Sequence, residues 1–183
     1  MKRLLTVLSL LACLVPARAA TLYFYDALAI PPANWATLAN WWTDAAHTTQ
    51  AAGLPTSADD VVLDSEAFVY SGTCIDVKSA TGSYAIYLGD ASEISGGTFD
   101  VFVFCDTLQG GGRSLISGGT FNCEVDTLAV AGALSISGGT FNSSVVISNM
   151  YVGTISGGTF NGYFEMEFCW GAFQSNEING GTF

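Results

Sequence analysis

Apolar and polar residues recur in a fixed order behind four phenylalanines in the second half of the chain. The positions four and six residues after each phenylalanine are mostly apolar: Val103 and Cys105, Val125 and Thr127, Val145 and Ile147, Phe164 and Met166. The positions three and five residues after it are mixed and mostly polar: Phe102 and Phe104, Glu124 and Asp126, Ser144 and Val146, Tyr163 and Glu165. Because side chains alternate across a strand, this order predicts a strand with a core face and a solvent face. Phe102 and Phe104 break the solvent face, so we expect that coil to be covered.

The phenylalanine belongs to a heptapeptide, Ile-Ser-Gly-Gly-Thr-Phe-Asn, that recurs along the same half of the chain. Five copies, of which the first and last vary slightly, begin at Ile94, Ile116, Ile136, Ile155 and Ile178, at intervals of 22, 20, 19 and 23 residues. A helix-pair repeat needs more than about 30 residues, whereas a coil of three short strands and three turns fits about 20 and tolerates insertions in its turns. The sequence therefore predicts an all-β fold, a right-handed parallel β-helix (β-solenoid) with an N-terminal cap.

Stacked coils place each residue opposite its counterpart in the next coil, about 4.8 Å away. The repeat thus predicts an isoleucine ladder through the five copies, and it predicts a phenylalanine stack of Phe99, Phe121, Phe141, Phe160 and Phe183. The phenylalanines are followed by Asp100, Asn122, Asn142 and Asn161. Two interpretations of these four residues stay open: a side-chain ladder hydrogen-bonded along the stack, or the ordinary preference of asparagine for turns.

Residues 20–58 lack the repeat, and we predict that they form a capping region in front of solenoid coils over residues 59–183. A strand is expected over residues 21–25, followed by a segment with a short helix. The most prominent apolar residues of that segment are three tryptophans: Trp35, Trp41 and Trp42. The open end of a solenoid exposes unpaired backbone and apolar core, so the tryptophans are interpreted as a cap over it. The alternative is a platform on which carbohydrate stacks.

Residues 1–19 have the features of a secretory signal peptide. Two basic residues precede an apolar run over residues 4–15, and small residues then allow cleavage after Ala19 or Ala20. The run is too short to span a membrane, and no later stretch is long enough. The alternatives are an uncleaved anchor and a lipoprotein signal at Cys13. We therefore expect a secreted or cell-surface protein without a transmembrane segment in its mature form.

Charge and composition narrow the function further. Cleavage would leave two basic residues, Lys78 and Arg113, against 16 acidic ones, which changes the formal net charge from −11 to −14. This charge argues against a nucleic-acid partner, and the apolar fraction of 50% argues against disorder. The single histidine, His47, excludes a histidine-rich metal site and is expected at the surface. Asp59 and Asp60 precede a strand and are interpreted as a turn rather than a ligand pair.

Four carboxylates fall on the predicted outer face of one sheet: Glu124, Asp126, Glu165 and Glu167. We interpret them first as a solvated acidic face. Calcium binding by these residues is the candidate metal site, and a carboxylate pair for glycoside cleavage is the catalytic alternative. Ser144 and Val146 lie in the coil between them and interrupt the cluster. No catalytic residue is predicted, and calcium is the only candidate cofactor.

Four cysteines remain after cleavage: Cys74, Cys105, Cys123 and Cys169. Cys105 and Cys123 stand six and two residues after their phenylalanines, so stacking would not bring them side by side. An oxidising compartment permits two disulfides in three arrangements, but free buried thiols that pack as small apolar groups are the preferred prediction. The absence of a CxxC motif argues against a zinc site. The glycine run before Arg113 lacks the lysine and helix of a phosphate loop.

Three early segments carry a family resemblance: Asn40–Trp42, Gly53–Pro55 and Asp59–Leu63. Together with the heptapeptides, they resemble bacterial secreted and surface β-helix repeat proteins of the autotransporter-passenger or adhesin-like class. The resemblance implies a parallel β-helix displayed outside the cytoplasm, with cell-surface carbohydrate or protein as the candidate partner. It carries over no catalytic residue. Because such proteins are usually much longer, we expect this chain to be a fragment that continues into further repeats.

The preferred function is therefore that of an exported, noncatalytic β-solenoid with a structural, surface-display or adhesive role. The alternative is a secreted polysaccharide-active enzyme, a glycoside hydrolase or lyase on the same fold. Lyases that act on acidic sugars need basic residues, of which the mature chain has only Lys78 and Arg113.

Overall fold

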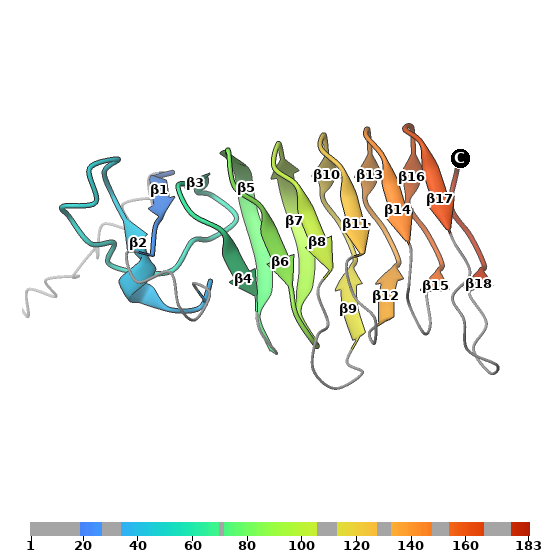
Figure 1. The fold of residues 1–183 in the computed structure, drawn as a ribbon, viewed down its shortest axis with the longest axis horizontal. Coiled ribbons are helices and arrows are strands. Elements are labelled where there is room, and N and C mark those ends of the chain that lie inside the picture. The colour runs from blue at the N-terminus through green and yellow to red at the C-terminus, as the bar shows by residue number, and fades with distance from the viewer. Residues whose placement is uncertain are drawn as a thin grey trace, which may run out of the picture.

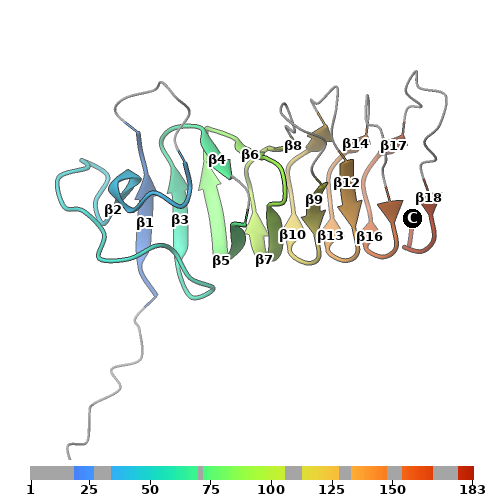
Figure 2. The same cartoon turned by 90° about the horizontal axis from the view of Figure 1, so that it is seen from below.

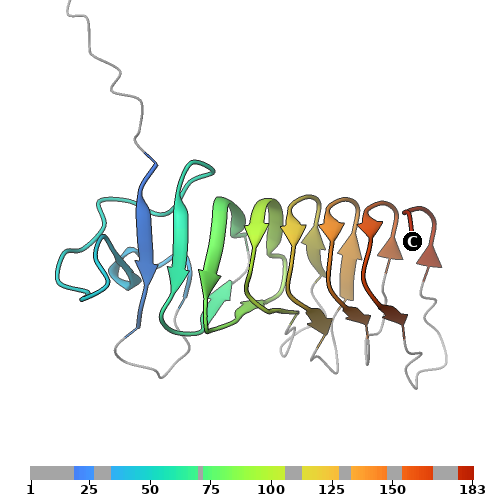
Figure 3. The ribbon, with the colours of Figure 1, turned by 90° about the horizontal axis from the view of Figure 1, so that it is seen from above.

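The strands of this protein stack side by side along one axis. A computed structural model describes residues 19–26, 34–69, 72–105, 113–127, 133–147, 154–166 and 177–183. Successive coils follow one another from the blue N-terminal end to the red C-terminal end (Figures 1 and 3). The predicted all-β solenoid is confirmed, with about five turns of about 19 residues each. The predicted signal peptide lies almost wholly outside the described residues.

Two sheets make up the walls of the solenoid. Twelve described strands form the larger sheet. Nine of them follow one path: β2 (Trp41–Trp42), β1 (Thr21–Phe24), β3 (Asp60–Leu63), β5 (Cys74–Gly82), β7 (Glu93–Phe99), β9 (Arg113–Ile116), β12 (Ala133–Ile136), β15 (Thr154–Ile155) and β18 (Glu177–Ile178). The other three run from β7 through β10 (Thr120–Phe121), β13 (Thr140–Phe141) and β16 (Thr159–Phe160). The second sheet has six described strands: β4 (Ala67–Val69), β6 (Ile86–Leu88), β8 (Val103–Cys105), β11 (Val125–Thr127), β14 (Val145–Ile147) and β17 (Phe164–Met166).

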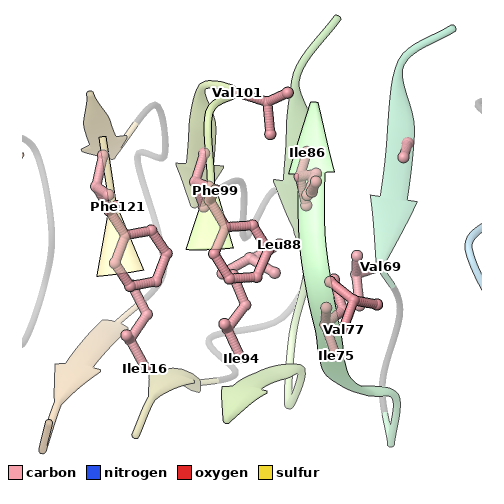
Figure 4. Close-up of a cluster of buried hydrophobic side chains, with 14 of the residues drawn as sticks. Val69, Ile75, Val77, Ile86, Leu88, Ile94, Phe99, Val101, Ile116 and Phe121 are labelled. Atoms are coloured by element: carbon pink, nitrogen blue, oxygen red, sulfur yellow. The ribbon is translucent and has the colours of Figure 1, made fainter. Parts of the chain in front are cut away.

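Equivalent residues of successive repeats lie opposite each other in the larger sheet. Phe121 pairs with both Phe99 and Phe141 across parallel strands. The predicted phenylalanine stack is confirmed, because neighbouring rings lie 4.8–5.0 Å apart with interplanar angles of 6–10°. The isoleucines also pair in register, and Figure 4 shows Ile94 and Ile116 beside the rings of their own coils. Phe99, Phe121, Phe141 and Phe160 are buried, and burial of each of these four rings stabilises the fold by roughly 1.5–3 kcal/mol, whereas Phe183 at the end of the stack is 61% exposed.

The second sheet supplies the opposite wall of the core. Its strands alternate as predicted, with the first and third residue of each strand facing inward. The inward residues of the repeat coils are buried in full or in part: Val103, Cys105, Val125, Thr127, Val145, Ile147, Phe164 and Met166. The prediction of one core face for this strand is therefore confirmed.

The two glycines of the heptapeptide serve different purposes at the corner after the isoleucine. At Gly118, an added Cβ would lie 2.2 Å from the carbonyl oxygen of Ser95 in the preceding coil, so no side chain fits. At Gly119, the backbone has φ +99°, a conformation that glycine adopts without steric cost. The first glycine lets two coils approach closely, and the second turns the chain into the strand that carries the phenylalanine.

A side-chain ladder runs along the next corner and decides between the two interpretations of the asparagines. Asn161 Nδ2 donates to Asn142 Oδ1 at 2.9 Å, and Asn142 Nδ2 donates to Asn122 Oδ1 at 2.8 Å. Asn122 Nδ2 then donates to Asp100 Oδ1 at 2.7 Å. Every amide donates toward the N-terminal end, and the ladder ends there at a carboxylate, which accepts without needing to donate. The predicted hydrogen-bonded ladder is confirmed.

Tryptophans close the N-terminal end of the core, as predicted. Strand β2 pairs antiparallel with β1 and ends the parallel stack at the blue end of Figure 2. The Trp41 ring is fully buried between Phe24 and Trp35, with ring centroids 4.9 Å and 4.7 Å away in edge-to-face geometry. Trp41 Nε1 donates to the Trp35 carbonyl at 2.8 Å, so burial of the ring leaves no donor unpaired.

The helix expected around the tryptophans is wrong in extent. Only a three-residue 3₁₀ helix forms, η1 (Leu38–Asn40), and none of its residues is buried. Trp41 and Trp42 are instead extended in β2. Aromatic residues favour strands over helices, and pairing with β1 buries Trp41 more completely than an isolated short helix would. The described part of β1 also pairs in parallel with β3, so the capping region contributes to the solenoid wall itself.

Helices contribute little else to the fold. Within the described part of the chain, no helix is long and apolar enough to cross a membrane.

Candidate functional site

The outward face of the six-stranded sheet carries the residues that the sequence singles out for chemistry. The middle residue of each strand points away from the core because its two neighbours point inward. Parallel register places these middle residues in one column, which we call the outer column: Phe68, Tyr87, Phe104, Asp126, Val146 and Glu165. Three aromatic side chains occupy its first half, and two carboxylates separated by valine occupy its second half.

The carboxylates of the second half do not converge. Asp126 and Glu165 both pair with Val146, from opposite sides, so they are two coils apart. At about 4.8 Å per coil, their backbones lie about 10 Å from each other. Asp126 Oδ1 accepts from the Thr127 amide at 2.6 Å, and Glu165 Oε2 accepts from the Tyr163 hydroxyl at 3.0 Å. Each carboxylate is therefore engaged locally and within its own coil.

This spacing bears on the candidate calcium site and on the catalytic alternative. A calcium ion needs several oxygen ligands at about 2.3–2.6 Å, and a group of three His, Cys, Asp or Glu residues suited to a metal is absent from the described residues. Glu124 shares its coil and face with Asp126, while Glu167 lies outside the described residues. The serine and valine predicted to interrupt the cluster do separate the described carboxylates.

The aromatic half of the face forms a connected group. The rings of Phe68 and Tyr87 stack at 4.5 Å and 7°, and those of Tyr87 and Phe104 lie 5.3 Å apart with a tilt of 30°. Phe102 lies beside Phe104, at 6.2 Å and 7°. We call these four residues, together with the Glu66 carboxylate that accepts from the Tyr87 hydroxyl at 3.4 Å, the aromatic patch.

The alternation pattern finds two of the four rings of the aromatic patch. It identifies Phe102 and Phe104 as exceptions on the solvent face, but the expectation that Phe102 is covered is wrong, because its side chain is 49% exposed. Phe68 and Tyr87 belong to coils without the heptapeptide, so no repeat alignment places them in the same column. Only the strand register connects them to Phe104.

The described cysteines are free thiols, as preferred from the sequence, but only one is buried. Cys105 is fully enclosed, and this burial, together with the nearby Asp126 charge, raises the pKa of its thiol to about 12. Burial and the charge of Asp100 also raise the pKa of Cys123. The prediction of burial is wrong for Cys74, which is exposed, with its Sγ 3.2 Å from Ser95 Oγ. Raised pKa values keep the Cys105 and Cys123 thiols protonated and unreactive near neutral pH. Cys169 lies outside the described residues.

The single histidine has partners that the sequence does not reveal. His47 Nε2 lies 3.1 Å from Asp64 Oδ2, and its ring stacks on Tyr25 at 4.2 Å and 7°. Its side chain is 19% exposed, so the expectation of a plain surface histidine is wrong. Asp44 fixes the same loop by accepting from the amides of Thr48 and Thr49. The contacts attach this loop to the first coils, which is a structural role.

The paired aspartates stand where β3 begins: Asp59 closes a turn, its amide donating to the Thr56 carbonyl at 2.9 Å, whereas Asp60 is already the first residue of the strand, so the predicted turn is confirmed for Asp59 only. Asp59 accepts from the Ala20 amide and from the amide and hydroxyl of Thr56, while Asp60 accepts from Lys78 and Ser79. Burial raises the pKa of Asp59, but the hydrogen bonds outweigh it and hold the net pKa below its ordinary value. The side chains of Lys78 and Ser79 lower the pKa of Asp60. Both carboxylates are occupied by these protein donors.

Comparisons with known proteins add no name to this geometry. No protein family, curated protein or solved structure matches the chain.

The glycine run before Arg113 lies outside the described residues.

Proposed function

We propose that the protein is an exported, noncatalytic β-solenoid that serves as a rigid structural or adhesive element at the cell surface. The observation that carries this proposal is the pair of ladders that join the repeat coils. Stacked rings from Phe99 to Phe183 hold the coils together from inside, and the side-chain ladder from Asp100 to Asn161 holds them at a corner. A body joined in this way presents side chains at fixed intervals along a line.

Export is supported by the start of the chain and by its charge. Residues 1–19 combine a positive start, an apolar run and small residues at the expected cleavage position. The excess of acidic over basic residues favours solubility and repels anionic surfaces, as suits a domain held outside a cell.

The export half of the proposal is tested by expressing the full chain in a Gram-negative host and measuring its intact mass. We expect protein outside the cytoplasm that begins at Ala20 or Thr21. A matched variant, Leu8→Asp, interrupts the apolar run and should stay in the cytoplasm with its full mass. Wild-type protein that keeps its full mass in the cytoplasm would overturn the export assignment.

The noncatalytic half is tested by incubation with a panel of neutral and acidic polysaccharides. Reducing ends report hydrolysis, and ultraviolet absorbance of unsaturated products reports lyase activity. We expect neither above the level of a heat-denatured control. Turnover that disappears in Asp126→Asn with Glu165→Gln would instead establish the polysaccharide-active enzyme and overturn the noncatalytic assignment.

A further inference from the structure

The outward face of the six-stranded sheet is divided into two halves of different chemistry. Its strands β4, β6, β8, β11, β14 and β17 lie side by side along the solenoid (Figure 1). The aromatic patch covers β4, β6 and β8, and carboxylates follow on β11 and β17. Phe104 pairs directly with Asp126, so the two halves meet without a gap. Tyr163, 62% exposed, adds a further ring near the acidic end.

The orientation of the rings restricts what this face recognises. Phe68 and Tyr87 turn their faces toward each other along the solenoid axis, at 4.5 Å and 7°. Their edges are consequently turned toward the outside. A sugar ring stacks on the face of an aromatic ring, and the two faces that Phe68 and Tyr87 turn toward each other are not open to it. Ring edges carry partial positive charge and pack against the faces of other aromatic rings or against oxygen atoms, both of which a polypeptide supplies.

Charge identifies the partner more closely. The six strands of this sheet contain carboxylates but no lysine or arginine. The two basic residues after position 19 lie on strands of the larger sheet, Lys78 in β5 and Arg113 in β9. Lys78 is already engaged, with its Nζ 2.7 Å from Asp60 Oδ2. The acidic half therefore has no internal counter-charge on its own sheet and complements a basic partner.

We propose that this face binds a basic polypeptide segment that carries aromatic side chains. The partner's aromatic rings pack on the edges of the aromatic patch, and its lysine or arginine side chains pair with Glu124, Asp126 and Glu165. This inference rests on the proposed adhesive role and names the partner class for it. Aromatic anchors supply most of the contact area, whereas the charges set orientation and speed of association.

A short peptide of defined pattern tests the proposal on the full chain. The probe is Trp-Thr-Trp-Thr-Lys-Thr-Lys, which in extended form presents two tryptophans and two lysines on one side over about 20 Å. The control peptide has glutamates in place of both lysines, and a cello-oligosaccharide serves as the sugar probe. Isothermal titration at low and high salt measures all three. We expect the basic peptide to bind more tightly than the acidic one, with an affinity that falls at high salt.

Three variants locate the binding surface. Phe102→Ser with Phe104→Ser should weaken binding of the basic peptide at least tenfold. Asp126→Asn with Glu165→Gln should weaken it a few-fold and reduce its dependence on salt. The matched control is Thr140→Ser, which changes an outward side chain on β13 of the larger sheet and should leave the affinity unchanged.

The possible outcomes separate this inference from the proposed function. Three results would each overturn the inference. The two peptides could bind equally tightly, the double serine variant could bind the basic peptide as tightly as the wild type does, or the basic peptide could fail to bind at low salt. Binding of the sugar probe that the double serine variant abolishes would assign the face to carbohydrate instead. Circular dichroism confirms that each variant is folded. None of these results changes the export and turnover measurements, on which the proposed function is judged separately.

Discussion

The N-terminal coils and the repeat coils fill the same inward column with different side chains. In the first coils this column holds Leu22, Val61 and Ala80, and from Phe99 onward it holds only phenylalanine. The repeat coils obtain their packing from identical rings stacked on one another. The N-terminal coils obtain theirs from unlike residues of different sizes, with the buried tryptophans of the cap completing the volume. The same backbone register is therefore compatible with two ways of filling a core.

The difference has a consequence for how each half specifies its structure. Identical coils fix the alignment of residues within a coil, because a one-residue slip would move every apolar side chain to the outside. They do not distinguish one coil from the next, since a shift by a whole coil brings the same residues together again. The unlike residues of the N-terminal half, in which Trp41 is buried against Phe24 and Trp35, have no identical coil to shift onto. We infer that this half sets the starting point from which the repeats continue.

The largest effect is expected from a charge placed inside the stack. Phe141 is buried between the rings of Phe121 and Phe160. Phe141→Asp removes two ring contacts and buries an unpaired carboxylate, which costs about 5 kcal/mol or more. Cooperative unfolding of the repeat half should be lost, as followed by circular dichroism during thermal melting.

The control for this variant lies three residues away on the solvent side of the same coil. Ser144→Asp introduces the same charge on the outward face and should change the free energy of unfolding by no more than about 0.5 kcal/mol. If the two variants melt alike, the assignment of inward and outward positions is wrong.

The next largest effect is expected in the N-terminal half. Trp41→Ala leaves a cavity between Phe24 and Trp35 and should cost about 3–5 kcal/mol. Hydrogen exchange followed by mass spectrometry should show early loss of protection in β1 and β3, while β13 and β16 stay protected. Phe121→Leu, a smaller change in the repeat half, should produce the opposite order. Uniform loss of protection in both variants would show that the two halves unfold as one unit.

The difference between the repeat half and the N-terminal half also determines how much of the structure can be predicted from the sequence. In the repeat half, five copies of one heptapeptide predict the ring stack, the isoleucine ladder and the inward positions, because identical residues must stack in register. In the N-terminal half, the register between unlike strands depends on the lengths of the corners. Phe68 and Tyr87 therefore could not be assigned to the outer column without the structure. The contact of His47 with Asp64 depends on a loop conformation that no repeat encodes.

A smaller effect should distinguish the two halves by their tolerance of a single methyl group. At Gly138, an added Cβ would lie 2.3 Å from the carbonyl oxygen of Ser117 in the preceding coil. Gly138→Ala should force the coils apart and cost about 1–3 kcal/mol. At Gly53 in the capping region, nothing lies within 4 Å of an added Cβ. Gly53→Ala should therefore change the thermal midpoint little, and equal destabilisation by both variants would contradict the close approach of the repeat coils.

The smallest effect concerns acid, and it belongs to the N-terminal half. The hydrogen bonds from Ala20 and Thr56 hold the pKa of Asp59 below its ordinary value of 3.8, despite the opposing effect of burial. A carboxyl group whose pKa is lower in the folded state stabilises the fold above its unfolded pKa, and this contribution is lost as pH falls through the folded pKa. In the chain that retains Ala20, the thermal midpoint should therefore fall between about pH 5 and pH 2, and less steeply in Asp59→Asn.

Thr56→Ala refines this measurement, because it removes the hydroxyl donor to Asp59 and keeps the amide donor. Its acid dependence should lie between those of the wild type and Asp59→Asn. Protection from hydrogen exchange should follow the same order in β1 and β3, since Asp59 joins the turn before β3 to the start of β1 through Ala20. Two results together would contradict this assignment: the acid transition begins in the repeat coils, and Asp59→Asn melts like the wild type at every pH. The acid-sensitive contacts would then lie in the repeat half of the molecule.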